Sequence, residues 1–562
     1  MPSHKIVNIT SLKPSLQNTL SSALGISGVM AQLLINRGVN TPAEAESFLN
    51  GGLDDLLDPF AFSDMRKAVA LIEQKIGNKE KIMVFGDYDV DGVTALALVK
   101  GTLHKKNADV MHLVPHRIND GYGLNKEALQ LARKNNVKLL ITVDCGTSSH
   151  NLIAELRKDQ IDVIVTDHHE SAQQELPPAS AIINPKLKNC PYAYKNLAGV
   201  GVAYKLCQAL CANPLKEELD LVSLGTIADV VPLDGENRII AREGLLKLNQ
   251  AKRAGIKALI EVSRIKDKKI NSTFVSFILG PRINASGRMD SAEIALRLLL
   301  SRHPEDALEY ARAVDSLNRQ RQKIESSIFE EAKAIIEREI NFKEHRVIVV
   351  AKEGWHEGVL GIVASKLADR FYRPTIVVSL NGGLSKGSGR SIKNFHLFSA
   401  LVECRELLGN FGGHSHAVGL QVDSNRLEEF RQKINLLAKN KLSFEDLLPS
   451  LDVDMELGLS QVNQELAEEI ELLEPFGTGN SRPLFFTRGL KVKGSPAVLG
   501  RDALKFWVSD GKVTLPAIGF GMGSFCDSLV NAENFDLVYT PRIDSWQGRN
   551  SLILEVEDIF FR

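Results

Sequence analysis

Carboxylates gather in one stretch of the chain, residues 81–96 (KIMVFGDYDVDGVTAL). A short apolar run, residues 82–85, predicts a buried strand that ends at a glycine. Asp87, Asp89 and Asp91 then follow at alternate positions, which lie on one side of an extended segment. Three like charges this close repel one another unless a cation neutralises them. The stretch therefore predicts a site for a divalent metal ion.

Three further segments repeat the pattern of an apolar run that ends in a metal-ligating residue type. Asp144 ends LLITVD, Asp167-His168-His169 ends IDVIVTDHH, and Asp229 ends SLGTIAD. We expect each run to be a strand, and the carboxyl ends of parallel strands meet at one edge of a sheet. Carboxylates with a minority of imidazoles suit Mn²⁺ or Mg²⁺, and the imidazoles favour Mn²⁺. Two such ions about 3.5–4 Å apart would activate water and stabilise a phosphoryl transition state.

Each piece alone has a simpler interpretation. A single aspartate after a strand is most often the N-cap of the next helix, which applies to Asp144 and Asp229. A lone histidine pair more often packs against its neighbours than binds a metal. DYDVDG resembles part of a calcium-binding EF-hand loop, but no glutamate stands at the twelfth position that such a loop requires. Four such segments in order favour the metal site.

The elements that must position these residues alternate in type. Apolar runs lie at residues 82–85, 109–114, 138–143, 161–166 and 181–183, and helical patterns lie between them at 93–104, 125–135, 149–158 and 198–212. Strands that alternate with helices at this spacing predict a parallel, doubly wound sheet. Residues 231–300 are mainly helical, with a predicted loop at 280–290 (GPRINASGRMD).

The chain of 562 residues is too long for one hydrophobic core. We expect an α/β, multidomain protein with a helical N-terminal segment and the parallel-sheet domain in residues 1–303. Residues 304–341 predict one long connecting helix, and residues 342–448 a smaller α/β domain with glycine-rich turns at 382–389 and 412–413. Residues 449–562 carry short strands with turns, which predict a small β-barrel or sandwich.

The composition is that of an ordinary globular protein, 44% hydrophobic and 24% charged. The formal net charge is −1, so a nucleic-acid site would have to be a local basic patch. The six cysteines lack CxxC spacing, which indicates reduced thiols rather than disulfides or a zinc site. No apolar run approaches the ~18 residues that cross a bilayer, so we expect a cytoplasmic protein without membrane contact.

The motifs together resemble a known superfamily. DYDVDG, VDCGTS, TDHHE and IADVVPL are similar to the four motifs of the DHH phosphoesterases. GPRINASGRMD, GWHEGVLGIVASKL, GSGRS and FGGHSHAVGL resemble the RecJ single-strand-specific exonuclease branch with its DHHA1 domain. The C-terminal β region is similar to the OB-like domain of that branch. The resemblance runs from about residue 40 to the C-terminus.

The resemblance implies a ligand set for two divalent ions, with Mn²⁺ favoured and Mg²⁺ as the alternative. The implied catalytic and metal-binding residues are Asp89, Asp91, Asp144, His168, His169 and Asp229. Asp87 becomes a supporting residue, and we expect Asp167 to orient an imidazole, since ligating histidines usually donate their other N–H to an acceptor. Other branches carry a histidine four residues before the first ligand, where this chain has Phe85.

Several residues could bind the phosphates of a substrate, because guanidinium, imidazole, hydroxyl and backbone N–H groups all suit an anion. The candidates are Arg117, Arg282, Arg288, Ser388, Arg390, Gly413 and His414. For each arginine alone, a surface salt bridge is the commoner role. The resemblance favours Arg390 and His414 as binders of a 5′ end. Trp355, His356 and Glu357 precede a predicted helix and could line the same cleft, and the alternative for His356 and Glu357 is to cap that helix.

Aromatic residues of the C-terminal region could stack on bases beside a basic groove. The candidates are Phe506, Trp507, Phe520 and Trp546, with Arg501, Lys505, Arg542 and Arg549 nearby in sequence. Some of these aromatic side chains must form the core of a barrel. We therefore expect no more than one or two of them to contact the bases of single-stranded nucleic acid.

The resemblance implies a 5′→3′ exonuclease that hydrolyses single-stranded DNA to 5′-mononucleotides by a two-metal mechanism, in DNA repair and recombination. It further implies single-stranded DNA with a 5′ end as substrate, and a single-strand-binding protein and a helicase as partners. One alternative is a DHH-type phosphodiesterase for short oligonucleotides or cyclic dinucleotides, although the C-terminal β region favours a polymer. Another is an inactive scaffold, which the six intact ligand positions disfavour.

Overall fold

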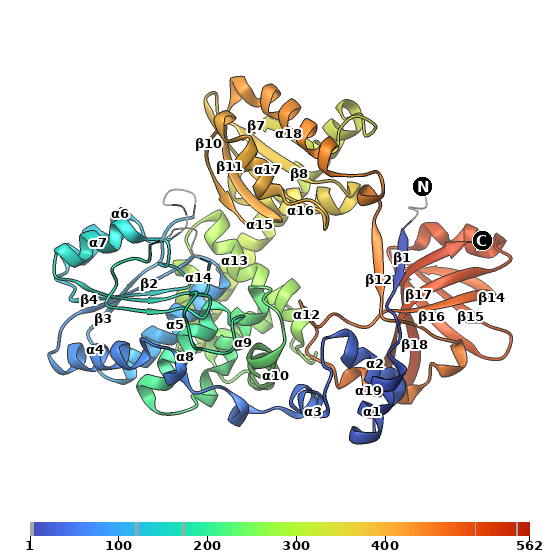
Figure 1. The fold of residues 1–562 in the computed structure, drawn as a ribbon, viewed down its shortest axis with the longest axis horizontal. Coiled ribbons are helices and arrows are strands. Elements are labelled where there is room, and N and C mark those ends of the chain that lie inside the picture. The colour runs from blue at the N-terminus through green and yellow to red at the C-terminus, as the bar shows by residue number, and fades with distance from the viewer. Residues whose placement is uncertain are drawn as a thin grey trace.

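Three lobes are visible in the computed structural model, which describes residues 5–117, 121, 123–170, 175–500, 502–546 and 549–561 (Figure 1). The first lobe contains a parallel sheet and a group of helices, the second a smaller mixed sheet, and the third a β-barrel. The 36-residue helix α15 (Pro304–Glu339) leads from the first lobe to the second. This arrangement confirms the predicted multidomain α/β fold.

The parallel sheet of the first lobe has the strand order β3-β2-β4-β5-β6. Its strands are β2 (Ile82–Gly86), β3 (Val110–Leu113), β4 (Leu139–Val143), β5 (Asp162–Thr166) and β6 (Ala181–Ile183). Helices α4 (Met65–Gly77), α5 (Val90–Lys105) and α8 (Gly199–Cys211) share a core with one face, and α6 (Lys126–Lys134) and α7 (His150–Lys158) with the other. Successive residues of a strand point to opposite faces, so the apolar runs fill both cores.

A group of helices follows the sheet in the chain and packs beside α5. It consists of α9 (Leu219–Ala228), α10 (Gly235–Gln250), α11 (Ala254–Val262), α12 (Ser272–Phe274), a π-helical turn (Val275–Leu279), α13 (Gly280–Met289) and α14 (Glu293–Leu300). The predicted loop at 280–290 is wrong, because most of it is helix α13. Pro281 stands in the first turn, where no N–H is needed. Gly287 lets the helix approach Tyr88, since a Cβ there would lie 2.8 Å from the Tyr88 carbonyl oxygen.

The second lobe is a five-stranded sheet with the order β10-β11-β9-β8-β7. Its elements are β7 (Ile348–Glu353), α16 (Leu360–Phe371), β8 (Thr375–Leu380), β9 (Leu384–Arg390), α17 (Leu397–Glu403), β10 (Leu408–Gly413), β11 (Ala417–Asp423) and α18 (Leu427–Lys441). The glycine-rich turns predicted at 382–389 and 412–413 are largely strands β9 and β10. Glycine in β9 allows neighbouring side chains to pack closely against the strand. A Cβ at Gly389 would lie only 2.8 Å from the side chains of Leu397 and Val418.

The third lobe contains a closed barrel, because β14 pairs with both β15 and β17. Its elements are β12 (Ser450–Val453), β13 (Met455–Glu456), α19 (Gln464–Glu471), β14 (Phe485–Leu499), β15 (Ala503–Ser509), β16 (Thr514–Phe520), α20 (Cys526–Asn531), β17 (Phe535–Trp546) and β18 (Arg549–Phe561). Phe485, Phe506, Phe535 and Tyr539 are buried in its core. This confirms the predicted C-terminal OB-like barrel.

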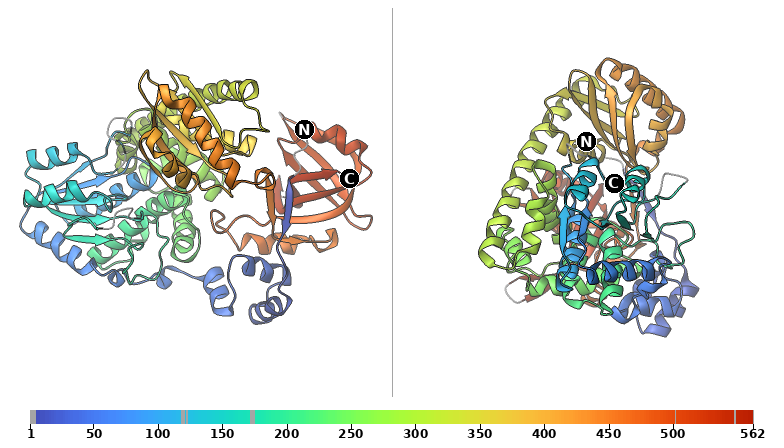
Figure 2. Two further views of the ribbon diagram at one scale, coloured as in Figure 1. Left: turned by 45° about the horizontal axis from the view of Figure 1, so that its top comes forward. Right: turned by 90° about the vertical axis from the view of Figure 1, so that its left-hand side faces the viewer.

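The N-terminal segment lies beside the barrel, not beside the parallel sheet (Figures 1 and 2). It contains β1 (Ile6–Ile9), α1 (Pro14–Leu24), α2 (Gly28–Asn36) and α3 (Pro42–Asn50), and β1 pairs with β12. The buried side chains of α1, α2 and α3 belong to the same core as the barrel. The sequence analysis grouped this segment with residues 51–303, because local periodicity does not show which partner covers an apolar helix face. We call residues 5–50 and 449–561 together the C-terminal module.

Within the described ranges, no single helix is long and apolar enough to cross a membrane. The helices α1 and α2, which are bent by 114° relative to each other, pass that test only as a pair and only by length and composition.

Candidate metal centre and substrate cleft

Four separate parts of the chain bring acidic and imidazole side chains to one edge of the parallel sheet. Asp87, Asp89 and Asp91 follow β2, Asp144 follows β4, and Asp167, His168 and His169 follow β5. The expectation that Asp229 follows a strand is wrong, because it ends helix α9. The run that precedes it is buried on all sides, and such a run does not distinguish a strand from a buried helix.

Distances from one imidazole nitrogen define the centre of the cluster. His168 Nε2 lies 3.3 Å from Asp144 Oδ1, 3.6 Å from Asp229 Oδ2 and 3.8 Å from Asp91 Oδ2. Three sets of potential ligand atoms each lie within 4.8 Å of one another: Asp91, His168 and Asp229; Asp144, His168 and His169; and Asp87, Asp89 and Asp144. The structure thus brings all six predicted ligands together, and Asp87 joins them.

Local backbone geometry aims these side chains into the cluster. Asp144 has φ 59°, in the left-handed region that non-glycine residues occupy mainly at turns and functional sites. Asp89 is the N-cap of α5 and accepts from Gly92 N at 3.1 Å. Asp91 accepts from the backbone N–H groups of Gly199 (2.6 Å) and Val200 (2.8 Å) at the start of α8. A Cβ at Gly199 would collide with the Asp144 carboxylate.

Several buried polar atoms of the cluster test whether it fits a cation. Among the described residues, His168 Nδ1 and Nε2, Asp87 Oδ1 and Asp229 Oδ2 are buried without a hydrogen-bond partner. Leaving such atoms unpaired costs free energy, and buried charges are normally paired or bound to a metal. Oxygen and imidazole donors suit Mn²⁺ or Mg²⁺. The residues present therefore fit divalent cations.

Burial and mutual repulsion also shift the pKa values of the clustered side chains in the protein without metal. Burial, followed by repulsion from Asp89, raises the pKa of Asp91 to about 7. Burial and neighbouring aspartates also raise the pKa values of Asp144 and Asp229 well above the usual range. Burial, together with the positive charge of His169, lowers the pKa of His168 to about 3. A bound cation would favour the ionised carboxylates and the neutral imidazole, which are the ligating forms.

Asp167 fixes the histidine pair. Its Oδ1 accepts from the backbone N–H groups of His168 (2.7 Å) and His169 (3.0 Å) and lies 2.8 Å from His169 Nδ1. Its Oδ2 accepts from Thr147 N at 2.9 Å. Burial opposes its ionisation, but these hydrogen bonds hold the pKa of Asp167 at about 2. This contact to the ring is the orienting role predicted for Asp167, since an acceptor held against one imidazole nitrogen fixes the direction of the ring.

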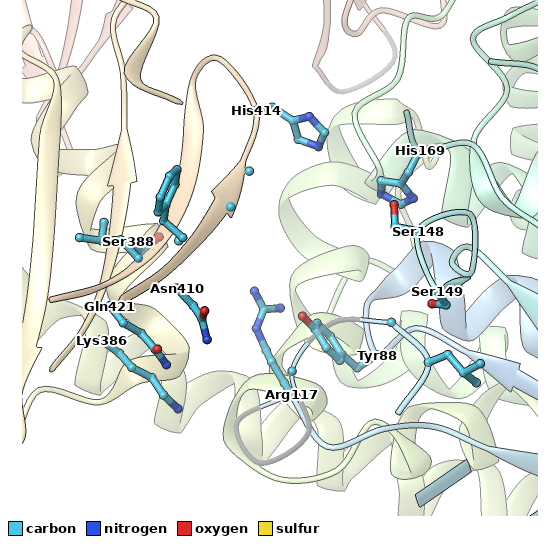
Figure 3. A pocket seen from close by; sticks show the side chains of 18 of the residues that line it. Tyr88, Arg117, Ser148, Ser149, His169, Lys386, Ser388, Asn410, His414 and Gln421 are labelled. Carbon is cyan, nitrogen blue, oxygen red and sulfur yellow. The ribbon is translucent and has the colours of Figure 1, made fainter. Parts of the chain in front are cut away.

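A cleft of about 1160 Å³ separates the edge of the parallel sheet from the second lobe. Tyr88, Arg117, Ser148, Ser149 and His169 line it on one side, and Lys386, Ser388, Asn410, His414 and Gln421 on the other (Figure 3). A smaller hollow of about 330 Å³ lies directly over the carboxylates and includes Asn284 and Arg288. Tyr88, Arg117 and His169 line both spaces, so the cluster adjoins the cleft.

The structure places the predicted phosphate binders at different positions relative to the cleft and the hollow. Arg117, Ser388, Gly413 and His414 line the cleft. Arg288 lines the hollow and donates to the Gly358 carbonyl at 3.0 Å.

Arg390 lies beside the cleft on β9 and donates to Ser388 Oγ at 3.3 Å and to the Gly389 carbonyl at 2.8 Å. Arg282 lines neither space: it donates to Asp315 Oδ1 of α15 at 3.0 Å, which is the salt-bridge role that is commoner for a lone arginine.

The guanidinium groups around the cleft repel one another. Burial, then the charges of Arg117, Arg321 and Arg390, lower the pKa of Arg288 to about 9. Burial and Arg117 also lower the pKa of Arg390. Positive groups held this close in a partly desolvated cleft are suited to a multiply charged anion.

Several residues that line the cleft or the hollow are not among the predicted site residues. Asn284 accepts from Val90 N at 3.2 Å and faces the hollow, and Tyr88 lies under the Arg117 guanidinium at 4.7 Å. Both belong to motifs that the sequence analysis quoted, GPRINASGRMD and DYDVDG, so their position in those motifs was the available signal. Lys386, Asn410 and Gln421 had no such signal, because only the antiparallel pairing of β9, β10 and β11 brings them together.

The remaining candidates for contact with nucleic acid differ in whether their side chains are accessible. Phe506 is a core residue of the barrel, whereas Trp507 and Phe520 are 47% and 62% exposed. The side chains of Trp546 and Arg549, and residue Arg501, lie outside the described part, and Arg542 pairs with Glu555. Trp355 is buried and donates to Glu331 at 3.0 Å, so it does not line the cleft; His356 caps the following turn and Glu357 reaches the cleft.

Comparisons with known proteins agree with this architecture. Three family profiles match: the DHH family, N-terminal domain, at residues 81–226; the DHHA1 domain at 344–440; and the RecJ OB domain at 453–558. The chain is 39% identical over 543 residues to the single-stranded-DNA-specific exonuclease RecJ of Bacillus subtilis, covering 96% of this chain and 69% of the relative. It is 34% identical over 560 residues to RecJ of Escherichia coli, with 95% and 96% covered.

Solved structures show the same similarity. RecJ of Thermus thermophilus in complex with Mn²⁺ superposes with a TM-score of 0.85 at 28% identity, covering 99% of this chain and 79% of that one. The same protein in complex with Mg²⁺ gives a TM-score of 0.78 at 26% identity, with 99% and 78% covered.

Proposed function

Since the chain belongs to the family of RecJ single-stranded-DNA-specific exonucleases, we propose that it hydrolyses single-stranded DNA from the 5′ end and releases 5′-mononucleotides. The observation that carries this proposal is the position of the carboxylate and imidazole cluster at the wall of an arginine-lined cleft between two lobes. The substrate is a polymer of phosphodiesters, and the cleft combines a cation site with groups that bind phosphate.

We assign two divalent cations to the cluster. Asp91, His168 and Asp229 would hold one, and Asp87, Asp89, Asp144 and His169 would hold the other, with Asp144 near both. Mn²⁺ and Mg²⁺ both suit these donors, and solved relatives carry each of them. When bound, the pair supplies positive charge that stabilises the phosphoryl oxygens and activates a water for attack on phosphorus.

The protein groups position the strand relative to that centre. We assign the 5′-terminal phosphate to the donors of the second lobe, Ser388, Arg390 and His414, together with Arg117. Arg288, in the hollow over the carboxylates, lies where it would contact the scissile phosphate. The 5′ end would be held on one lobe and the metal centre lies on the other. Their separation would set how far from its 5′ end the DNA strand is cut.

Strand selectivity follows from the cleft and the barrel. A cleft between lobes joined by α15 would admit one strand and exclude a duplex. Cross-strand pairing places Trp507, Phe520, Lys493 and Lys505 on one outer face of β14, β15 and β16. In OB-folds this is the face that binds oligonucleotides, and aromatic side chains there stack on successive bases.

The wider setting follows from the family. We propose that the enzyme acts in DNA repair and recombination in the cytoplasm. A helicase would expose its substrate, and a single-strand-binding protein would cover the remaining strand.

A degradation assay tests the proposal. With Mn²⁺, a single strand labelled at its 5′ end should release labelled mononucleotide at once, while the same strand labelled at its 3′ end should shorten progressively. A blunt duplex of the same sequence should persist. Release from the 3′ end would contradict the proposed polarity. Rapid hydrolysis of a dinucleotide or a cyclic dinucleotide with no action on the long strand would favour the oligonucleotide phosphodiesterase instead.

A further inference from the structure

A further cavity, of about 900 Å³, lies in the first lobe. Its walls come mainly from the start of α4 and from residues 184–196, which lie between β6 and α8. Lys186, Lys188 and Lys195 line it. We propose that these three lysines bind phosphates of the DNA strand on the 3′ side of the cut. The inference rests on the proposed function, because it takes a single strand to be held at the metal centre.

One end of the cavity reaches the metal centre. Glu170, which follows the predicted ligand His169, lines both this cavity and the cleft. Asn184 is buried, and its Nδ2 donates to the His169 carbonyl at 2.9 Å. Asn184 Oδ1 accepts from Lys186 N at 2.8 Å. One side chain therefore joins the backbone of the first lysine to the backbone of a predicted metal ligand.

The other end of the cavity lies near the contact between the first lobe and the C-terminal module. Asn196 lines the cavity, and its carbonyl accepts from Asn237 Nδ2 at 2.5 Å. The same Nδ2 donates to the Pro232 carbonyl at 3.0 Å. Next to Pro232, Leu233 N donates at 2.7 Å to the carbonyl of Thr478, a residue of the C-terminal module. The cavity therefore extends from the metal centre toward the module that carries the barrel.

This position matches the direction in which the strand would leave the metal centre. The proposed function places the 5′ end on the second lobe and a later part of the strand on the barrel face that carries Trp507 and Phe520. The part between them must pass from the metal centre to the C-terminal module. Because every nucleotide carries a phosphate, a row of cations beside that path would contact successive phosphates.

The charge of the lysines is available to a phosphate. All three side chains are exposed. Lys195 Nζ donates to the neutral carbonyl of Cys190 at 2.7 Å, and the other two lysines form no ion pair within the described part of the chain. Two carboxylates also line the cavity: Asp64 accepts from Ile182 N at 2.9 Å, and Glu170 lies at the end next to the cleft. The lysines therefore leave the cavity with an excess of positive charge.

The backbone that carries the lysines is held by buried contacts. The ring of Tyr192 stacks on Phe62 at 3.8 Å, and its hydroxyl donates to Glu236 Oε2 at 2.6 Å. The hydroxyl of Tyr194 donates to Asp234 Oδ1 at 2.5 Å. These contacts fix the loop to α4 and to the start of α10, so that only the lysine side chains have to be ordered when DNA binds.

Removal of charge in the full-length chain tests the inference. Lys186→Gln/Lys188→Gln removes two of the three charges and keeps side chains that are compatible with an exposed loop. Each lost contact to a single strand should make log K less dependent on log salt by ~0.7, so the slope for a strand of about 30 nucleotides should change by about 1.4. At moderate salt, Kd should rise about tenfold. Fluorescence anisotropy without divalent metal measures both quantities.

Neutral methylphosphonate linkages locate the contact. Each linkage of a 5′-phosphorylated strand is replaced in turn, and binding is measured for the wild type and for the double variant. At linkages that contact the lysines, the replacement should weaken binding to the wild type and have little further effect on the variant, as in a double-mutant cycle. We expect this coupling at linkages on the 3′ side of the cut and not at the 5′-terminal phosphate.

A matched control removes the same charge elsewhere on the first lobe. Lys134 on α6 and Lys257 on α11 are exposed, and neither lines the cleft, the hollow or this cavity. Lys134→Gln/Lys257→Gln should therefore keep the salt dependence and the linkage profile of the wild type. Melting curves show whether each variant is folded, and Lys195→Gln provides a second test at the other end of the cavity.

Three results would contradict these assignments in different ways. Equal salt dependence of the wild type and Lys186→Gln/Lys188→Gln, or coupling at no linkage, would overturn the inference. A variant that binds the strand normally but has lost affinity for a free 5′-mononucleotide would assign the cavity to the released product instead. Failure of the wild type itself to bind single strands would contradict the proposed function, so the wild-type measurement separates the two failures.

Discussion

The two walls of the cleft differ in which parts of the chain supply their residues and in how deeply those residues are buried. The metal wall is defined by Asp87, Asp89, Asp91, Asp144, His168, His169 and Asp229. It combines strand and helix ends from four separate parts of the chain, and most of its side chains are buried. The DHHA1 wall is defined by Lys386, Ser388, Asn410, Gly413 and His414. It comes from the antiparallel part of one small mixed sheet, and most of its groups are exposed. Like charges that are buried together need a cation and many supporting hydrogen bonds, because burial disfavours their ionised forms, whereas binding a mobile phosphate needs accessible donors.

The largest effect is expected from removing Asp144, a predicted metal ligand at the centre of the metal wall. Asp144→Ala should lower kcat about 10³-fold, because metal stabilisation of a phosphoryl transition state is worth several kcal/mol. Binding of single-stranded DNA, measured by fluorescence anisotropy, should persist, since the DHHA1 wall is intact. Asp109→Asn, at the opposite end of the sheet, is the control. Near-normal turnover by the Asp144 variant would remove that residue from the metal centre.

A milder change tests whether the metal wall depends on its supports. Asp167→Asn keeps the shape of the side chain but weakens the bond to His169 Nδ1. We expect a 10- to 100-fold loss of Mn²⁺ affinity, the range for groups that orient a ligating histidine. Calorimetric titration with Mn²⁺ measures it. A variant with wild-type affinity would mean that His169 is oriented by other contacts.

The DHHA1 wall should respond differently to substitution. Arg390 lies beside this wall and donates to its Ser388. Arg390→Gln removes a charge-assisted contact to phosphate worth about 1.5 kcal/mol, so KM for a 5′-phosphorylated strand should rise about tenfold while kcat changes little. The exposed Arg426→Gln on the same lobe is the control. Steady-state kinetics with 5′-phosphate and 5′-hydroxyl strands measure the effect. A fall in kcat equal to that of the metal-wall variants would contradict the division of labour between the walls.

The smallest effect is expected far from both walls. Trp507→Ala on the outer face of the barrel should weaken binding of a long strand by about 1 kcal/mol, or fivefold, and leave a tetranucleotide unaffected. Val530→Ala, another exposed apolar side chain of the barrel lobe, is the control. Equal affinity of wild type and the Trp507 variant for strands of every length would show that this face does not contact DNA.

The two walls also differ in how well they could be predicted from the sequence. The six predicted ligands stand out in the sequence because each follows an apolar run and belongs to a motif, and the structure brings these six side chains together. The predicted loop at 280–290 was wrong because glycine and proline usually interrupt helices, whereas here they allow helix α13 to start and to pack closely. Phe506 and Trp507 are neighbours with the same chemistry, and only the inward or outward direction of alternate barrel residues separates them.

The sequence by itself indicated the type of chemistry, the parallel sheet and the acidic and imidazole residues that cluster, because each of these depends on local patterns of strand, turn and side-chain type or on the motifs that contain them. Only the tertiary structure decided which groups face those ligands across the cleft, and that Arg282 pairs with Asp315 instead of lining it. It also decided that the N-terminal helices belong with the barrel and that residues 473–480 rest on residues 229–234, which join α9 to α10. Apart from the Arg282–Asp315 pair, whose members are 33 positions apart, these contacts join residues hundreds of positions apart, and local sequence patterns carry no information about such distant partners.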